Sequence, residues 1–123
     1  MNSTLIGTVL FFAIAPALGA EINPSLGCKG NPAVVSACYS LRGRISTYNG
    51  TPSLRIWPVG SARLLGVLPT ENEIMPNNIR GKVSFGQSVF ANLEVCPFTQ
   101  ARSGAMQFVC VESATNVLVV SGH

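Results

Sequence analysis

The sequence predicts an all-β domain: a small five-stranded antiparallel barrel that is OB-like, or alternatively a disulfide-braced sandwich. Three observations predict this class. Apolar and polar residues alternate with the period of strands after residue 20, turn residues separate the alternating runs, and four cysteines accompany them. The chain has 123 residues, which leaves room for one domain after a leader is removed.

The first 20 residues contain no charged side chain and are nearly all apolar from Leu5 to Leu18. This pattern is typical of a secretory signal peptide. Because Pro16 interrupts the run, it falls short of the roughly 20 apolar residues that a membrane-spanning helix needs. We therefore expect a signal peptide at 1–20, a single β domain at 21–123, a secreted or periplasmic location and no transmembrane segment. Gly27-Cys28 leaves lipidation of Cys28 as an alternative.

The first half of the domain contains a short turn and three strands. Asn31-Pro32 favours one helical turn that ends before Cys38. Asn49-Gly50 is a strong signal for a two-residue hairpin turn, because both residues tolerate positive φ. Alternation on both sides of this turn, and a further run that Pro69 ends, predict strands at 39–48, 53–57 and 62–68.

The second half contains two longer strands. The polar stretch 70–81 falls where an OB-like barrel usually carries a helix, but Pro76 argues against a long one. Strands four and five are predicted at 83–97 and 106–120, and residues 99–105 connect them.

The hairpin turn also predicts which side chains share a face. With two turn residues, Arg44 lies opposite Arg55 and Arg42 opposite Trp57. The outward face of the hairpin then displays five polar or aromatic side chains: Arg42, Arg44, Tyr48, Arg55 and Trp57. Such a face suits carboxylates, phosphates, sulfates or a sugar ring, and an Arg beside a Trp gains cation–π attraction. The alternative is a solvated sheet surface.

Four cysteines in a short exported domain predict two disulfides. Three pairings are available, and the local one joins Cys28 with Cys38 and Cys96 with Cys110. The pairing of strands four and five independently favours the second of these bridges. Zinc is the competing interpretation, but no two cysteines have metal-ligand spacing and the single histidine, His123, is the last residue. We expect no metal and no cofactor.

The same strand pairing brings two carboxylates together. If Cys96 lies opposite Cys110, then Phe98 lies opposite Phe108 and Glu94 opposite Glu112. Two facing carboxylates are unfavourable unless a cation or a proton lies between them. That cation comes from the arginines, or the pair binds calcium, or, as a more remote alternative, the pair serves a hydrolase of the glycosidase type.

Composition argues against other catalytic sites. The chain has no aspartate and one histidine, so a Ser-His-Asp triad cannot be assembled. The glycines lie in turns and form no phosphate-binding loop. A formal charge of +3 is too small to favour a nucleic-acid partner. We expect a protein that is not an enzyme.

Three segments resemble a family of small exported bacterial proteins. The first, Cys38 to Gly66, contains a near-Arg-Gly-Arg strand, a Tyr-Asn-Gly-x-Pro turn and an Arg-Ile-Trp-Pro-Val-Gly run. The other two are Glu94-Val95-Cys96-Pro97-Phe98 and Val109-Cys110-Val111-Glu112-Ser113. The resemblance implies a bacterial envelope or secreted protein. It transfers no activity and no site residue.

Two functions follow from the sequence. The first is a non-enzymatic module of the cell envelope that binds an anionic glycan, a lipid headgroup or a protein on the hairpin's outward face. The alternative is a secreted enzyme inhibitor or protein-interaction domain that acts through the loop 99–105, with Arg102 near its tip.

Overall fold

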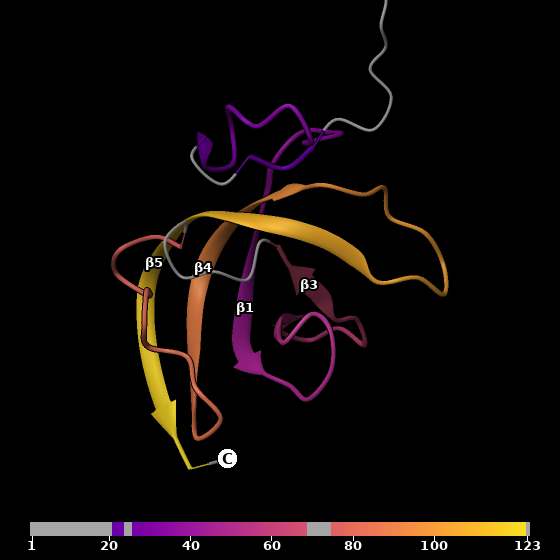
Figure 1. Ribbon diagram of the computed structural model, residues 1–123. Coiled ribbons are helices and arrows are strands. Elements are labelled where there is room, and N and C mark those ends of the chain that lie inside the picture. Colours follow the sequence, from indigo (N-terminus) through magenta and orange to yellow (C-terminus); the bar gives the residue numbers. More distant parts are fainter. Residues whose placement is uncertain (1–20, 24–25, 69–74, 123) are drawn as a thin grey trace, which may run out of the picture.

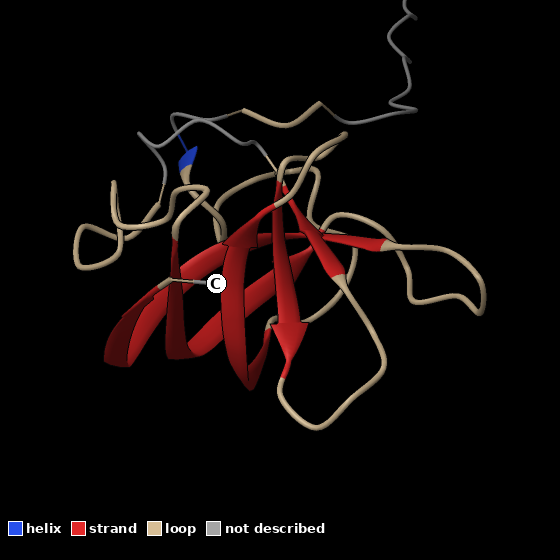
Figure 2. Ribbon diagram, turned by 90° about the horizontal axis from the view of Figure 1, so that it is seen from below, coloured by secondary structure: helices blue, strands red, loops and turns tan. Residues whose placement is uncertain are grey.

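The structure is a computed structural model that describes residues 21–23, 26–68 and 75–122. Its strands are β1 (Tyr39–Thr47), β2 (Leu54–Pro58), β3 (Leu65–Val67), β4 (Gln87–Pro97) and β5 (Gln107–Ser121). They form one sheet in the order β1-β2-β3-β5-β4, and β4 pairs back with β1, so the sheet closes in a ring (Figures 1 and 2). The predicted all-β class and five strands are confirmed. The predicted signal peptide at 1–20 lies outside the described residues.

The inward side chains of all five strands fill the ring. Alternate residues of β1 and β4, such as Ile45 and Leu93, are buried, as are Ile56 and Val109. Gly43 on β1 is required by this packing, because a Cβ there would lie 2.6 Å from the Cγ2 of Ile56. Sheet closure and a continuous apolar interior therefore explain why a chain of this size folds with no helical layer among the described residues.

The pairing of β1 with β2 differs from the prediction by two residues. Arg44 lies opposite Trp57 and Ser46 opposite Arg55, so the predicted opposition of Arg44 with Arg55 is wrong. The connection is longer than two residues, since the Tyr48 amide donates to the Ser53 carbonyl at 2.7 Å. Pro52 has no N–H for the ladder and is buried against Gly66 instead. An even shift keeps every side chain on its predicted face.

One strand pair is parallel, contrary to the predicted antiparallel sheet. β3 runs parallel to β5, with Gly66 opposite Phe108. A ring with an odd number of strands cannot alternate direction throughout, so closure of five strands requires a parallel neighbour. Gly66 allows the contact, because a Cβ there would lie 2.6 Å from the Phe108 ring and 2.8 Å from Pro52.

β4 and β5 pair over most of their length, with two irregularities. The register shifts between Phe90 and Asn92 and again between Glu94 and Val95. At the first shift β5 holds Asn116 at φ 50°, the left-handed conformation that Asn tolerates. At the second, Glu112 is left without a partner across the ladder. Bulges of this kind redirect side chains along a strand.

The connection from β3 to β4 closes one end of the ring. Within its described part, Pro76 begins a single turn in which the amides of Ile79 and Arg80 donate to its carbonyl at 3.0 and 2.9 Å. Met75 and Ile79 from this turn are buried in the core. No long helix is present between residues 75 and 86, and residues 69–74 of the predicted polar stretch lie outside the described part.

The segment before β1 lies outside the ring, across one end of β4 and β5 (Figure 1). The predicted helical turn is a single bonded turn, from the Val34 amide to the Asn31 carbonyl at 3.2 Å. The Asn31 side chain also accepts from the Ala33 amide at 3.1 Å. This segment contributes Cys28, Ala33 and Val34 to a second apolar cluster on the outer face of the sheet.

Both disulfides join this segment to the sheet. The bridges are Cys28 with Cys110 and Cys38 with Cys96, so the existence of two disulfides is confirmed and the predicted local pairing is wrong. The predicted register is right, because Cys96 and Cys110 are direct partners across β4 and β5. They do not bond to each other because the segment that covers them carries the other two cysteines.

Candidate functional site

The five predicted surface residues form a continuous face on β1, β2 and their connection. We call this set, Arg42, Arg44, Tyr48, Arg55 and Trp57, the arginine face. Two of its arginines stack on its two aromatic rings: the Arg44 guanidinium lies 5.1 Å from the centre of the Trp57 ring, and that of Arg55 lies 4.9 Å from the centre of the Tyr48 ring. The observed register therefore replaces an expected arginine–arginine repulsion with two cation–π pairs.

Hydrogen bonds fix the orientation of these side chains. The Trp57 indole N–H donates to the Ser61 carbonyl at 2.7 Å, and Arg55 Nε donates to the Pro52 carbonyl at 3.0 Å. Arg42 is held separately, by bonds from its Nη1 to Asn92 Oδ1 at 3.2 Å and to the Asn116 carbonyl at 2.8 Å. The face is thus preorganised rather than a set of mobile long side chains.

The charge on this face is not neutralised within the described part of the chain. The ion pair found there joins Lys29 to Glu94, far from the hairpin turn, and no carboxylate pairs with Arg42, Arg44 or Arg55. Arg44 Nε is also buried without a hydrogen-bond partner. A buried unsatisfied donor costs about 1 to 3 kcal/mol. The arginine face therefore carries positive charge that no described carboxylate neutralises.

The face continues across the sheet into apolar side chains. Arg44 lies between Trp57 on β2 and Phe90 on β4, and Phe90 lies opposite Leu118 on β5. Phe90 is half-buried, whereas 55% of Leu118 is exposed. Sequence reasoning missed both residues, although each lies at an outward position of its strand's alternation.

The two predicted carboxylates do not face each other. Glu94 lies opposite Ser113, because the bulge displaces Glu112 from the ladder. Lys29 connects them instead: its ammonium lies 3.2 Å from Glu94, and its backbone amide donates to Glu112 at 3.2 Å. The cation that this pair requires is therefore Lys29, a residue that sequence reasoning missed, and not the predicted arginine. Both carboxylates therefore contact Lys29 of the N-terminal segment.

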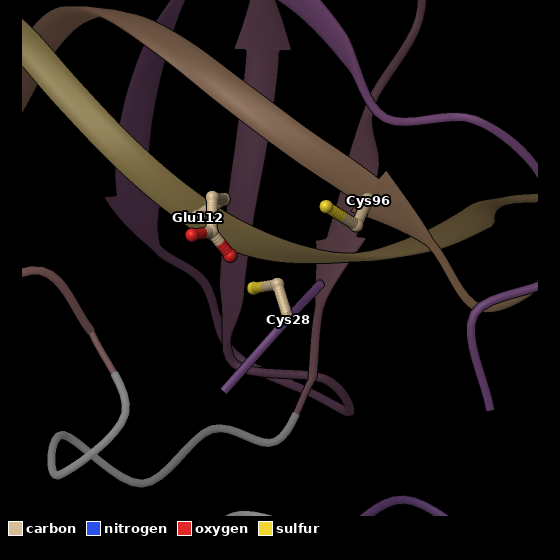
Figure 3. A group of neighbouring side chains, drawn as sticks. All are labelled: Cys28, Cys96 and Glu112. Carbon is tan, nitrogen blue, oxygen red and sulfur yellow. The ribbon is translucent and has the colours of Figure 1, made fainter. Parts of the chain in front are cut away.

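Glu112 also lies near two sulfur atoms (Figure 3). Its carboxylate and the Sγ atoms of Cys28 and Cys96 lie within 4.8 Å of one another. Each sulfur is already bonded to another cysteine, so neither can act as a thiolate ligand. In the oxidised protein this cluster is the covered junction of the two disulfides and is unsuited to a metal ion.

The loop 99–105 lines a second surface feature. It forms a shallow depression together with residues 62–64, and Arg63, Arg102 and Gln107 are among its lining residues. Gln107 Oε1 accepts from Arg63 at 3.1 Å and from the Tyr39 hydroxyl at 2.8 Å, which orders the floor. Arg102 is exposed at the tip, where its carbonyl accepts from the Ala105 amide.

Comparisons with known proteins give no relative from which a function can be transferred. No family model, no curated protein and no solved structure matches the chain. Within the part of the chain that the structure describes, no helix has the length and apolar character needed to cross a bilayer.

Proposed function

We propose that the protein is an exported, non-enzymatic binding module that holds an anionic ligand on the arginine face. The observation that carries the proposal is Arg44. Its guanidinium is stacked on Trp57, its Nε has no hydrogen-bond partner, and no described carboxylate neutralises it. An oxyanion beside the guanidinium of Arg44 neutralises this charge through charge-assisted hydrogen bonds.

The chemistry of the arginine face favours a ligand that carries an oxyanion group and also has some apolar or ring surface. Planar guanidinium groups recognise phosphate, sulfate and carboxylate, and the Trp57 and Tyr48 rings add flat contact area. An anionic glycan, a lipid headgroup and an acidic protein segment all have this character. Nucleic acid fits less well, because the cations form one compact face and not a stripe along the molecule.

A catalytic role has less support. Glu94 and Glu112, the candidate acid and base, are occupied by Lys29 and lie on separate positions beside a bulge. A carboxylate-pair hydrolase needs two carboxyl groups that flank a bound sugar in a cleft. Neither carboxylate lines the depression at 62–64 and 101–107 or the apolar pocket between residue 22 and Phe108.

We also propose that the ring is OB-like and that the protein is secreted or periplasmic. The OB-like assignment is supported by the strand order β1-β2-β3-β5-β4 and the parallel pair of β3 with β5. Export is supported by two disulfides, which persist in oxidising compartments. The described residues 21–122 contain the five strands, the two bridges and the two apolar clusters. The protein to test is therefore the expected mature form, residues 21–123.

The test is a fluorescence titration, because Trp57 is the only tryptophan and lies on the arginine face. The probes are a heparin hexasaccharide and a short-chain phosphatidylglycerol below its micelle concentration. We expect saturable, salt-sensitive quenching, and we expect Arg44→Ala to weaken binding about tenfold. Arg102→Ala removes the same charge from the depression at 62–64 and 101–107 and serves as the matched control. Equal affinity in Arg44→Ala and the unmodified protein would reject the proposal.

A second function is favoured by the depression beside the loop 99–105. There the exposed Arg102 lies with Arg63 and Gln107 along a depression whose lining residues do not belong to the arginine face. In this function the chain is an inhibitor or interaction domain whose loop binds an exported enzyme. Capture of a partner that survives both Arg102→Ala and deletion of the loop tip would exclude it.

A further inference from the structure

One end of the molecule presents an aromatic ring on a tight turn. Ser84 and Gln87 exchange backbone hydrogen bonds at 3.0 and 3.1 Å, which leaves Phe85 and Gly86 at the tip. Phe85 is 68% exposed. The Gly122 amide donates to the Gly86 carbonyl at 3.0 Å, so the turn is fastened to the end of β5. The ring is therefore displayed to solvent on an ordered support.

A further apolar side chain is exposed near this turn. β5 ends here, and Leu118, at an outward position opposite Phe90, has 55% of its surface exposed. Figure 1 shows the turn between the β3–β4 connection and β4 at the lower end of the molecule, next to the end of β5 and on the same side as the end of β1. We call Phe85 and Leu118 the apolar tip.

Positive charge surrounds the apolar tip. Lys82 precedes the turn and is exposed, and its carbonyl accepts from the Gln87 side chain at 2.8 Å. The row from Trp57 through Arg44 and Phe90 ends at Leu118, so the arginine face and Leu118 share one outer surface. The described carboxylates of Glu94 and Glu112 contact Lys29 under the N-terminal segment, at the other end of β4 and β5.

We propose that this end of the molecule docks on the surface of an anionic lipid bilayer, with the apolar tip inserted among the acyl chains and Arg44, Arg55 and Lys82 against the headgroup phosphates. The inference rests on the proposed function and names its ligand as a membrane surface. Interfacial binding needs apolar area to insert and cations that attract the leaflet, and both are present on one surface.

The charge pattern favours a bilayer over a second copy of this chain. Two copies placed tip to tip would bring Lys82 and the arginine faces together with no described carboxylate to oppose them. A soluble anionic glycan uses the arginines but gives no role to Phe85, whose ring lies on a separate turn.

The experiment is co-sedimentation of residues 21–123, oxidised, with vesicles of phosphatidylglycerol and phosphatidylcholine and with vesicles of phosphatidylcholine alone. We expect binding to the anionic vesicles that falls as salt rises. Phe85→Ser and Leu118→Ser should each weaken partitioning about tenfold, since each removes inserted apolar surface. Val35→Ser is the matched control, because Val35 is 46% exposed and belongs to the N-terminal segment. Lys82→Gln should weaken binding about fivefold.

The outcomes separate this inference from the proposed function. Vesicle binding that Arg44→Ala abolishes but Phe85→Ser and Leu118→Ser leave intact would overturn insertion and keep the arginine face. Binding of heparin hexasaccharide without binding to anionic vesicles would overturn the bilayer and also keep the face. Salt-insensitive dimerisation that Leu118→Ser abolishes would overturn insertion alone. Absence of binding to every anionic probe would contradict both proposals.

Discussion

The disulfide pairing gives the most quantitative prediction. Cys28–Cys110 spans 82 residues, so on its own it would lower the chain entropy of the unfolded state by the equivalent of about 4.5 kcal/mol. With Cys38–Cys96 still in place, that bridge closes a loop of only about 24 residues, which corresponds to about 3.5 kcal/mol. The change to make is the paired substitution Cys28→Ala with Cys110→Ala, which removes the bridge without burying a hydroxyl group.

We expect this variant to lose about 3 kcal/mol of unfolding free energy and to remain folded at 25 °C, because a domain of this kind has roughly 5 to 15 kcal/mol in total. Urea unfolding followed by Trp57 fluorescence measures the loss. The matched variant Cys38→Ala with Cys96→Ala should lose about the same amount. A loss below about 1 kcal/mol in both variants would refute the loop-closure reasoning.

The pairing itself is read from an unreduced tryptic digest. Cleavage after Lys29, Arg42, Lys82 and Arg102 places the four cysteines in four different peptides. The structure predicts that the peptide ending at Lys29 is linked to 103–123 and that 30–42 is linked to 83–102. Linkage of 83–102 to 103–123 would instead show the local pairing and would contradict the packing of the N-terminal segment.

Three other substitutions test separate contacts. Gly66→Ala should destabilise the protein by about 1 to 3 kcal/mol, since its Cβ would meet Phe108 and Pro52, whereas Gly86→Ala meets nothing within 4 Å and should change stability by less than about 1 kcal/mol; equal urea midpoints for the two would contradict the close approach of β3 to β5. Lys29→Ala should lower the free energy of unfolding by at most about 1 kcal/mol, because the Lys29 ammonium is largely exposed and the hydrogen bond from its backbone amide to Glu112 persists. A larger loss in thermal unfolding would mean that the ion pair holds the N-terminal segment in place. Arg55→Ala should lower affinity for heparin hexasaccharide about fivefold at low salt and little at high salt, as expected of a screened charge, and a salt-independent loss in calorimetry would argue for a structural role.

The outward position of the arginines and of Trp57 was predictable, although their partners were not. Alternation along 39–48 and 53–57 assigns each side chain to a face, and a shift of two residues preserves that assignment. The turn length was misjudged because Asn49-Gly50 is a strong two-residue signal, while the burial of Pro52 against Gly66 depends on β3, which is distant in sequence. A local signal cannot include that contact.

The predicted cysteine pairing and the predicted opposition of the two carboxylates were wrong for a related reason. The register of Cys96 with Cys110 was predictable from spacing, but the path of the segment before β1, which brings Cys28 and Cys38 over them, has no local signature. The predicted opposition of Glu94 with Glu112 assumed an unbroken β4–β5 ladder, and no residue near Glu112 signals the bulge in the sequence. Phe85 lies inside the strand predicted at 83–97, whereas β4 begins at Gln87, so its place on a turn was not predicted.

Chemical-shift mapping tests the location of the binding site most directly. Residues 21–123, labelled with ¹⁵N and oxidised, would be titrated with short-chain phosphatidylglycerol while the backbone amide resonances and the indole N–H of Trp57 are followed. We predict saturable shifts in β1, β2 and the turn 84–87, with those of residues 101–107 unchanged. Shifts confined to the depression at 62–64 and 101–107, or no shifts at all, would contradict the arginine face as the binding surface.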